Sequence, residues 1–442
     1  MENNLLEKEK TTRENRIWVR IAAACNEKCL FCLDADAQNG KLIEDEKIRK
    51  DMMVWFKTGM YNRIIISGWE ASIHPKFPEY IRYAKELWYN RIQTVTNGNR
   101  YADPKFLDWV VQAGLQEITF SIHGHTKEIH DYLTATPGSF DKALRAIITI
   151  RKKYPQIILN IDIVVNKKNV RFLPKIVKLF MKLSIFEFDI LQIIPFGRGF
   201  SEYKDALFYN IEDEIASLHE TWKLSRYPGM YMWTNRFPVE AFEWYEDLIQ
   251  DPRKIKSETM GEAYMMFDDF IRSQGIKKPI CFGDQCDVCF LKQYCHGYLS
   301  SRKKEVISWE IYTISGQDNI PSSAEYVRIE GEEFPSEIYK KYGRTQENFL
   351  EYIHSLALPS WTKFLNLPRC IREDHNDEWL YESYKDDEVQ DDGVAHYTNR
   401  YIKNHYRIKS LRCHSCKYVD SCQWIHINFI RSYGFSLLKP LK

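Results

Sequence analysis

Three cysteines near the amino terminus have the spacing of a metal-cluster site. Cys25, Cys29 and Cys32 are separated by three and then two residues, in the run Cys-Asn-Glu-Lys-Cys-Leu-Phe-Cys. Three thiolates hold only three corners of a four-iron, four-sulfur (4Fe-4S) cluster, so one iron keeps a position for an outside ligand. A zinc site, which usually has four protein ligands, and cysteines buried without any metal are the alternatives. The spacing favours a cluster with catalytic capacity.

The elements that would position these cysteines alternate between strands and helices. An apolar run at 17–22 suits a buried strand, and the cysteines follow it directly. Further strands are expected at 63–66, 92–96, 116–122, 156–165 and 186–194, and helices at 47–57, 77–87, 105–112, 140–153 and 173–183. Six such units predict an α/β fold, a partial (β/α)6 barrel with right-handed crossovers. Functional loops of such folds gather at the carboxyl ends of the strands, which is where the cysteines lie.

The cysteine motif, with Phe31 before its last member, resembles the signature of the radical S-adenosylmethionine (SAM) superfamily. The segment Ser67-Gly-Trp-Glu70 stands where that superfamily usually has Gly-Gly-Glu, although Trp69 replaces the second glycine and Ala71 the usual proline. The resemblance covers about residues 15–200. It implies that the open iron binds the amino and carboxylate groups of SAM, and that one electron splits SAM into methionine and a 5′-deoxyadenosyl radical.

The same resemblance implies which residues surround SAM. They are an aromatic residue in the motif and residues at strand ends: Phe31, Ser67, Gly68, Trp69, Glu70, Asn97, Ser121 and Asn166. Asn97-Gly98 is also a common turn dipeptide, and Ser121 and Asn166 could simply cap helices. No general base can be assigned. Three nearby histidines are expected to have polar surface roles rather than to form a metal set: His123, His125 and His130.

Eight further cysteines lie in the second half of the chain: Cys281, Cys286, Cys289, Cys295, Cys370, Cys413, Cys416 and Cys422. They form two trios with the pattern Cys-x2-Cys-x5-Cys, each preceded by a Pro-x-Cys segment. Two sets of four thiolates are enough for two more 4Fe-4S clusters, and two zinc sites are the alternative. Disulfides are not expected, because the charged amino terminus does not look like a signal peptide. The pairing of the eight cysteines stays open.

The repeated trio resembles the auxiliary-cluster extension called SPASM, found in sulfatase maturases, ribosomal-peptide maturases and some small-molecule dehydrogenases. That extension usually has one more cysteine, where this chain has Leu299 and His426. The resemblance implies auxiliary clusters that could accept the electron left on a substrate radical, bind substrate or relay electrons. A shorter, duplicated form of the extension is therefore expected.

The 442 residues are long enough for two or three domains. The expected segments are a tail at 1–15, the radical SAM partial barrel at 16–199, a helical, aromatic-rich connector at 200–275 with helices at 211–224 and 239–250, a first auxiliary module at 276–300, and a C-terminal region at 301–442 with the second module. A net charge of +1 gives no electrostatic case for general nucleic-acid or membrane binding. No apolar run approaches the roughly 20 residues of a membrane span, so a cytoplasmic protein is expected.

The sequence predicts a radical SAM oxidoreductase that takes hydrogen from its substrate. The SPASM-like trios favour a peptide or protein side chain, which would be oxidised or cross-linked. A small-molecule dehydrogenase acting on a sugar or cyclitol is the second hypothesis, and a non-catalytic zinc scaffold is a third of another class. The expected partners are the substrate and an electron donor such as flavodoxin or ferredoxin.

Overall fold

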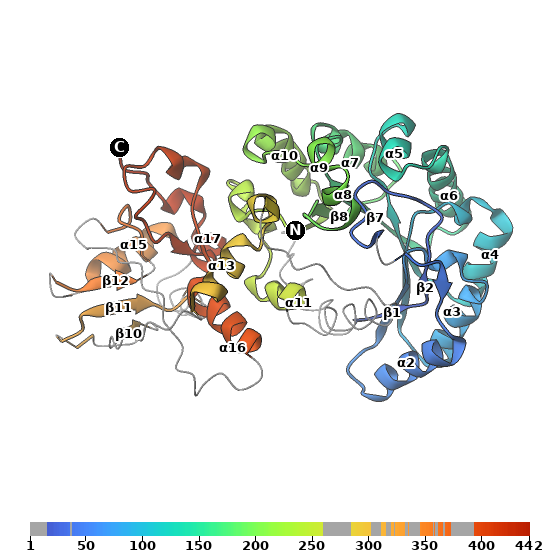
Figure 1. Ribbon diagram of the computed structural model, residues 1–442, viewed down its shortest axis with the longest axis horizontal. Coiled ribbons are helices and arrows are strands. Elements are labelled where there is room, and N and C mark those ends of the chain that lie inside the picture. Colours follow the sequence, from blue (N-terminus) through green and yellow to red (C-terminus); the bar gives the residue numbers. More distant parts are fainter. Residues whose placement is uncertain are drawn as a thin grey trace. The chain divides into compact units, whose positions relative to one another are not determined.

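The computed structural model describes residues 16–35, 38–259, 284–301, 311–314, 320–321, 323–331, 335, 345–356, 358, 361–365, 367–372 and 393–442. The chain divides into two compact units (Figure 1). The first unit comprises residues 1–237 and 268–289, and the second comprises residues 238–267 and 290–442. Each unit has its own sheets and its own buried residues.

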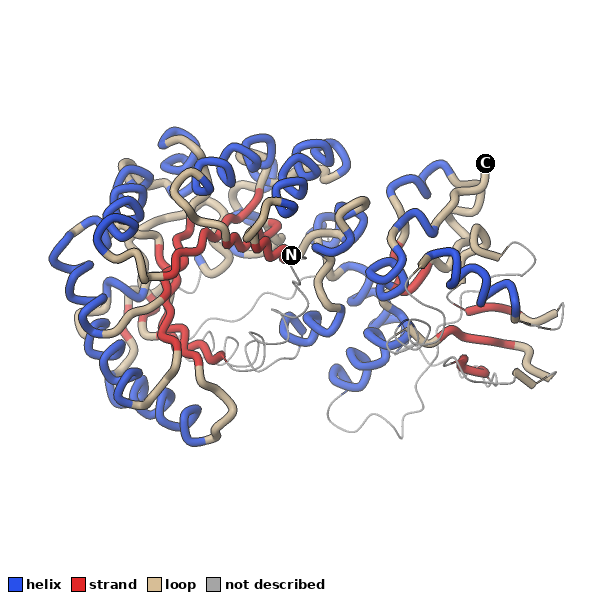
Figure 2. The backbone as a smooth tube through the Cα atoms, turned by 180° about the vertical axis from the view of Figure 1, so that it is seen from behind, coloured by secondary structure: helices blue, strands red, loops and turns tan. Residues whose placement is uncertain are grey.

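The first unit is built on a seven-stranded sheet in which every neighbouring pair of strands is parallel. The strands follow one another in chain order: β1 (Arg16–Arg20), β4 (Arg63–Ser67), β5 (Arg91–Thr96), β6 (Glu117–Ser121), β7 (Ile158–Val165), β8 (Glu187–Gln192) and β9 (Tyr231–Asn235). Figure 2 shows the strands curving as an open half-barrel with the helices along the convex side. All carboxyl ends therefore lie along one edge of the sheet.

Helices join successive strands of this sheet: α2 (Asp45–Lys57), α3 (Phe77–Glu86), α4 (Pro104–Ala113), α5 (Lys127–Thr134), α6 (Ser139–Lys153), α7 (Leu173–Met181), α8 (Gly197–Ser201), α9 (Lys204–Leu207) and α10 (Ile215–Trp222). Local sequence fixes their ends. In α4 the Asp103 carboxylate caps the N–H of Lys105, Pro104 occupies the first turn, and Gly114 ends the helix with φ 117°. Each of these residues has the conformational preference that its position needs.

The sheet is apolar on its helix-covered face and polar on the other. Along β7 the buried Ile161 and Ile163 alternate with Asn160 and Asp162, as the two-residue period of a strand requires. The polar face includes Glu117, which is 2% exposed and accepts hydrogen bonds from Arg63 at 2.7 Å, Arg91 at 3.2 Å and Asn160 at 2.8 Å. Three donors offset the cost of burying that carboxylate.

The structure confirms the six strands and the five helices between them that the sequence predicts, and it adds β9, α5, α8 and α9. Because β9 pairs with β8 along Glu187–Leu191, the sheet unit continues beyond the expected boundary at residue 199. The expected helix at 239–250 was wrong. That segment forms two short 3-10 turns, η7 (Val239–Phe242) and η8 (Glu246–Leu248), because Trp244 between them has a left-handed φ of 76°.

The second unit holds two small sheets. One is parallel, with the order β10 (Ile311–Ile314), β11 (Tyr326–Ile329) and β12 (Lys363–Leu365). The other is an antiparallel pair, β13 (Arg407–Ile408) and β14 (Ile425–His426). The helices that belong to it are α11 (Ile255–Thr259), α13 (Lys292–Ser301), α15 (Gln346–Ser355), α16 (Gly393–Arg400) and α17 (Ile427–Tyr433). Aromatic rings from α13, α16 and the turn that follows α16 form part of its core: Tyr294, Tyr397 and Tyr401.

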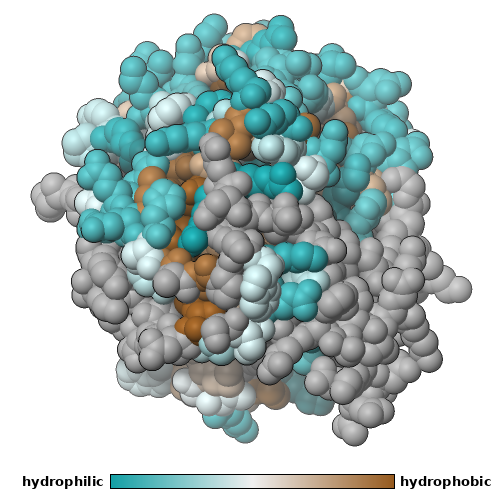
Figure 3. All heavy atoms as spheres, turned by 90° about the vertical axis from the view of Figure 1, so that its left-hand side faces the viewer, coloured by the Kyte–Doolittle hydropathy of each residue, from teal (hydrophilic) through white to brown (hydrophobic). Residues whose placement is uncertain are grey.

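Figure 3 looks onto the second unit, where most described residues are hydrophilic and the hydrophobic ones form a narrow strip. Across the described chain, no helix is both long enough and apolar enough to cross a bilayer.

We expect the substitution Phe120→Ala to destabilise the first unit. The Phe120 ring is fully buried and packs edge-to-face on Tyr101, with ring centroids 6.0 Å apart. Deleting a buried ring costs about 3–5 kcal/mol in the free energy of unfolding. Urea unfolding followed by circular dichroism measures this. The control Trp109→Ala removes a ring that is 41% exposed and should cost less than about 1 kcal/mol. Equal effects of the two substitutions would contradict this description of the core.

Candidate functional site

The amino-terminal cysteines lie in a loop closed by a short antiparallel ladder, β2 (Ala22–Ala23) with β3 (Lys41–Leu42). The N–H of Cys32 donates to the carbonyl of Cys29 at 3.2 Å, so these two residues share one turn. All three cysteines are half-buried and free of disulfides. The loop follows β1, at the carboxyl edge of the sheet.

The three thiols are close enough to affect one another's ionisation. Burial is the main cause that raises the pKa of Cys25 to about 12 and that of Cys32 to about 11. Burial, the Glu27 carboxylate and the other two thiols raise the pKa of Cys29 well above its usual value. Such thiols keep their protons at neutral pH unless a metal displaces them. The donor set thus fits a metal centre that takes three thiolates.

Within the described residues, no three His, Cys, Asp or Glu side chains are placed as a ready-made shell for a single metal ion. The grouping of the cysteines therefore rests on their shared loop and their mutual effect on pKa.

Glu70 ties the cysteine loop to two strand ends. It follows β4, is fully buried, and accepts hydrogen bonds from the N–H of Asn97 and the hydroxyl of Thr96, both at 2.8 Å, and from the N–H of Ser72 at 3.1 Å. Its own N–H donates to the carbonyl of Ala24, the residue before the first cysteine, at 3.1 Å. Burial raises the pKa of Glu70. The loop and the ends of β4 and β5 are therefore positioned together.

The residues before Glu70 pack against the start of the same loop. A Cβ on Gly68 would lie 2.7 Å from the carbonyl oxygen of Ala22, so only glycine fits there. The N–H of Trp69 donates to that oxygen at 3.2 Å, and its indole N–H donates to the carbonyl of Asp34 at 3.1 Å. Trp69 thus braces the far side of the cysteine loop. The Ser67 hydroxyl is buried with no hydrogen-bond partner among the described residues.

Of the other residues implied to contact SAM, Asn97 lies beside a cysteine, whereas Ser121 and Asn166 make hydrogen bonds elsewhere. The Asn97 side chain donates to the Asn26 side chain at 2.6 Å and lies 3.8 Å from the sulfur of Cys25. The Ser121 hydroxyl donates to Asp162 at 3.3 Å, and the Asn166 side chain accepts from the N–H of Lys168 at 3.0 Å as a turn cap. The structure therefore brings Asn97 beside the cysteines. Contact of these side chains with SAM stays a prediction.

A buried polar chain that the sequence did not reveal supports the loop. Glu27, between the first two cysteines, is 3% exposed and accepts from the Asn99 amide at 2.7 Å and from the Ser139 hydroxyl. That hydroxyl is 3.3 Å from Nε2 of His130. Burial is the main cause that raises the pKa of Glu27 to about 7. An acidic residue inside a cysteine motif was the available signal, but its partners are distant in sequence.

The expectation of surface roles was wrong for His123 and His130, which are 3% and 0% exposed. The N–H of His123 donates to Nδ1 of His130 at 3.1 Å, and the His123 ring meets Phe31 edge-on with centroids 4.5 Å apart. Burial lowers the pKa of both histidines, that of His130 to about 4. His130 is carried by α5 and faces the interior, and the His123 ring, in the connection before α5, packs against both His130 and Phe31. The local sequence could not show this packing. His125 is half-exposed.

The segment after β8 closes onto the cysteine loop. The N–H of Arg198 donates to the carbonyl of Cys32 at 3.1 Å, and its guanidinium donates to the carbonyl of Cys29 at 3.3 Å. Gly197 has a φ of 58°, and a Cβ there would collide with the carbonyl oxygens of Cys32 and Leu33. This close approach needs glycine. The cysteine loop is therefore held by backbone contacts as well as by buried side chains.

Comparison with protein families agrees with this geometry. Residues 19–173 match the family model of the Radical SAM superfamily. The match contains all three cysteines of the loop, together with Glu70 and Asn97. The first unit contains a radical SAM domain.

Two curated relatives share this domain. The AdoMet-dependent heme synthase of Methanosarcina barkeri is 28% identical over 183 residues, covering 40% of this chain and 50% of the relative. The probable GTP 3',8-cyclase of Saccharolobus solfataricus is 24% identical over 235 residues, covering 52% of this chain and 75% of the relative. The matched region thus spans only half the length of the heme synthase.

Similar solved structures include Streptococcus suis SuiB bound to precursor peptide SuiA, with a TM-score of 0.43 and 14% identity over 56% of this chain and 55% of that chain. Native anSMEcpe with bound AdoMet and Cp18Cys peptide has a TM-score of 0.40 and 18% identity over 55% of this chain and 66% of that chain.

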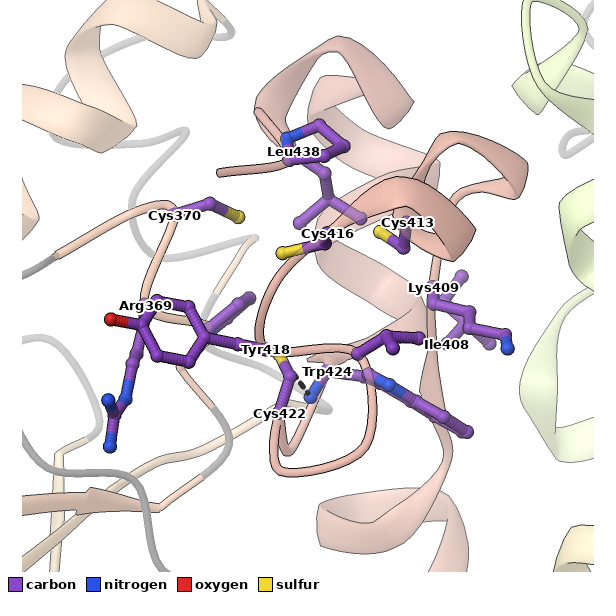
Figure 4. A pocket seen from close by; sticks show the side chains of 13 residues that line it. Arg369, Cys370, Ile408, Lys409, Cys413, Cys416, Tyr418, Cys422, Trp424 and Leu438 are labelled. Atoms are coloured by element: carbon purple, nitrogen blue, oxygen red, sulfur yellow. Dashed lines mark hydrogen bonds between the residues drawn. The ribbon is translucent and has the colours of Figure 1, made fainter. Parts of the chain in front are cut away.

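Outside the radical SAM domain, four distal cysteines line one cavity of the second unit: Cys370, Cys413, Cys416 and Cys422 (Figure 4). The loop that carries the last three is closed by the pairing of β13 with β14. Burial, followed by the thiols of Cys413 and Cys416, raises the pKa of Cys370 to about 11. The N–H of Trp424 donates to the sulfur of Cys422 at 3.4 Å. Four thiols around one space form a donor set of the kind that binds a 4Fe-4S cluster. As placed, they do not form a ready-made shell for a single metal ion.

The first distal trio is divided between the two units. Cys281 lies outside the described residues. Cys286 and Cys289 belong to the first unit, and the N–H of Cys289 donates to the carbonyl of Cys286 at 3.4 Å. Cys295, on α13 of the second unit, packs against the tyrosine cluster described above. Binding of a cluster by these cysteines stays a prediction.

His426, which replaces one expected cysteine, is fully buried and uses both ring nitrogens on backbone groups. Its Nε2 lies 2.7 Å from the carbonyl of Ile402, and its Nδ1 accepts from the N–H of Asn428 at 3.2 Å. In this arrangement neither nitrogen is available to a metal.

We expect Gly197→Ala to displace the cysteine loop and to lower the cluster content of the radical SAM domain. The added methyl group would collide with the loop backbone. The matched control is Gly138→Ala, because Gly138 also has a positive φ, 79°, but nothing lies within 4 Å of its Cβ position. Iron analysis after anaerobic reconstitution should show a loss of about four irons per chain in Gly197→Ala alone. Equal iron in both variants would refute the close approach.

We expect His130 to make the stability of the first unit depend on pH. Its pKa in the folded protein is about 4, below the value of about 6.5 in an unfolded chain, so the unfolded chain binds the proton first as pH falls. Through this group the wild type should lose about 2 kcal/mol of unfolding free energy between pH 8 and pH 5. Urea unfolding at both pH values should show a smaller loss for His130→Gln. The same loss in both proteins would exclude this role.

Proposed function

We propose that this protein is a radical SAM oxidoreductase that cleaves SAM reductively and takes hydrogen from a peptide or protein side chain. The observation that carries the proposal is the placement of Cys25, Cys29 and Cys32 on one braced loop at the carboxyl edge of a parallel half-barrel. When bound there, a 4Fe-4S cluster would leave one iron for SAM and supply the electron that generates the 5′-deoxyadenosyl radical.

The residues of the chain hold the cysteine loop in place and keep water away from the reaction. Glu70, Glu27 and Arg198 hold the loop from three directions, so the thiols do not have to be ordered when the cluster binds. Phe31 packs against an apolar cluster that includes Leu30 and Leu133. Such a wall suits a flat heterocycle and keeps water away from a reactive radical.

Polar groups are available beside this wall. The buried Ser67 hydroxyl lacks a partner among the described residues, and Asn97 lies beside Cys25. A buried hydroxyl without a partner gains most from a ligand that supplies one. We infer that both residues contact SAM.

The distal cysteines support the oxidative part of the proposal. Four thiolates from Cys370, Cys413, Cys416 and Cys422 would saturate a 4Fe-4S cluster, and no iron would remain open for substrate. This favours electron transfer over substrate ligation at that site. The SPASM-like spacing of the trios favours a peptide substrate.

A small-molecule substrate is the second candidate. The relatives named for heme synthesis and GTP cyclisation favour it. We place the peptide first because the distal cysteines have SPASM-like spacing.

We expect the anaerobically reconstituted, dithionite-reduced protein to convert SAM to 5′-deoxyadenosine, and Cys29→Ala to abolish this. Without one of three thiolates the cluster cannot be held at the open position. Chromatography of the products measures the reaction. The matched control, Cys416→Ala, alters the distal cavity and should keep SAM cleavage while losing about four irons per chain.

Two results would overturn the proposal. SAM cleavage by Cys29→Ala at the wild-type rate would remove the role of the cysteine loop. Bound zinc without iron in the wild-type protein would support the scaffold hypothesis instead.

A further inference from the structure

The concave face of the half-barrel, opposite the helices in Figure 2, carries polar side chains on three neighbouring strands. Ser121, the last residue of β6, is in register with Asp162 of β7, and Asp162 is in register with Asp189 of β8. Residues in register on neighbouring strands point to the same face of a sheet, and so do residues two apart on one strand. Asn160 of β7 therefore shares this face with the two aspartates.

Two acceptor oxygens on this face lack a hydrogen bond. Oδ1 of Asn160 and Oδ1 of Asp162 are both buried, and neither has a partner among the described residues. Asn160 is 6% exposed, and its amide N–H donates to Glu117 at 2.8 Å. A carboxylate can only accept, so this bond fixes which end of the Asn160 amide is the oxygen. Buried acceptors without donors are costly, and a ligand with N–H groups would relieve both.

The remaining oxygens of the two aspartates have short polar partners. Oδ2 of Asp162 accepts from the Ser121 hydroxyl at 3.3 Å, and Asp189 accepts from the Asn235 side chain. Both aspartates are only half-buried, so the carboxyl pair keeps part of its surface open to a ligand. The pair is thus held in place by its neighbours without being enclosed by them.

The two carboxyl groups also affect one another's charge. Burial, followed by the charge of Asp189, raises the pKa of Asp162 to about 8, although Ser121 and Arg236 act in the opposite direction. Within the described residues, no ion pair joins Arg236 to Asp162. Asp162 therefore holds a proton at neutral pH until a positive charge arrives beside it.

A cation fits this arrangement better than a neutral or anionic ligand does. An anion would be repelled by Asp189. A neutral ligand or a water molecule could donate to the two open oxygens but would leave the carboxyl groups competing for one charge. An ammonium group brings three N–H donors and a guanidinium group brings five, each with a full positive charge.

We propose that Asn160, Asp162 and Asp189 form the subsite for a basic side chain of the substrate, a lysine ammonium or an arginine guanidinium. The N–H groups of that cation donate to Oδ1 of Asn160 and Oδ1 of Asp162, and its charge lies beside both carboxyl groups. This inference rests on the proposed function for the peptide substrate, and it narrows the substrate class to peptides with a basic residue.

Binding of the cation exchanges one positive charge for another. Asp162 releases its proton to solvent, and the resulting carboxylate pairs with the incoming cation. Because the proton competes with the cation, the affinity should rise with pH below about 8 and level off above it. No covalent bond forms or breaks in this step.

The test is calorimetry of three short probes on the anaerobically reconstituted full chain with SAM. Two probes are basic, acetyl-Gly-Lys-Gly-amide and acetyl-Gly-Arg-Gly-amide, and the third has norleucine in the central position. At least one basic probe should bind at least about tenfold more tightly than the norleucine probe at pH 8. Asp162→Asn should abolish that preference. Circular dichroism and iron content then show whether this variant is folded.

The matched control is Asp141→Asn on α6, which removes the same charge from an exposed position. This control should keep the preference for the basic probe. No preference in the wild type, or the same loss in both variants, would overturn the proposal.

The wild-type protein provides a second measurement that does not depend on the folding of any variant. Between pH 6 and pH 7 its affinity for the basic probe should rise about tenfold, because one proton is released for each probe bound. The norleucine probe should show no such rise. A pH-independent affinity for the basic probe would exclude the exchange at Asp162.

SAM cleavage separates this proposal from the proposed function. If the wild type does not cleave SAM but binds the basic probe through Asp162, the proposed function fails and the cation subsite stands. If dithionite-driven cleavage occurs but the basic probe has no advantage over norleucine, only the cation subsite fails.

Discussion

The site depends on a carboxylate buried where water cannot reach it. An ionised carboxyl group in such a place is costly unless hydrogen bonds replace its hydration. Glu70 obtains them from Ser72, Thr96 and Asn97, all at 3.1 Å or less. Satisfying one side chain in this way fixes the ends of two strands and, through the backbone of Glu70, the start of the cysteine loop.

Glu27 is a second buried carboxyl group held by hydrogen bonds, on the other side of the loop. It is buried between two cysteines and reaches Asn99 and Ser139, which lie on different connections of the sheet. Each carboxylate would destabilise the fold if its donors were absent, so the loop has few alternative positions. Arg198 adds backbone contacts from a third connection. Positioning of this kind is what a site needs if it is to bind a cluster and a second ligand together.

Local patterns explain what the sequence could predict. Short stretches of sequence contain the patterns of the three cysteines, the apolar β4 and the amphipathic α6. The existence and order of these features were therefore predictable. The bond between Ser139 and Glu27 joins residues 112 positions apart, and α5 turns His130 inward only because of tertiary packing. The seventh strand, Tyr231–Asn235, was missed because its aromatic residues also fit a helical connector. Long-range contacts of this kind leave no local signature.

The grouping of the distal cysteines also could not be predicted from local sequence, but the fold shows it. Spacing defines the trio of Cys413, Cys416 and Cys422, but only the fold brings Cys370 to it. Cys370 lies 43 residues before Cys413, so no local pattern assigns it to this trio rather than to the trio of Cys286, Cys289 and Cys295. The grouping follows from the packing around the cavity, where the four thiols share walls formed by Tyr418, Trp424 and Leu438. Packing between segments that are distant in the chain, rather than the spacing of the cysteines, therefore decides which thiols can act together.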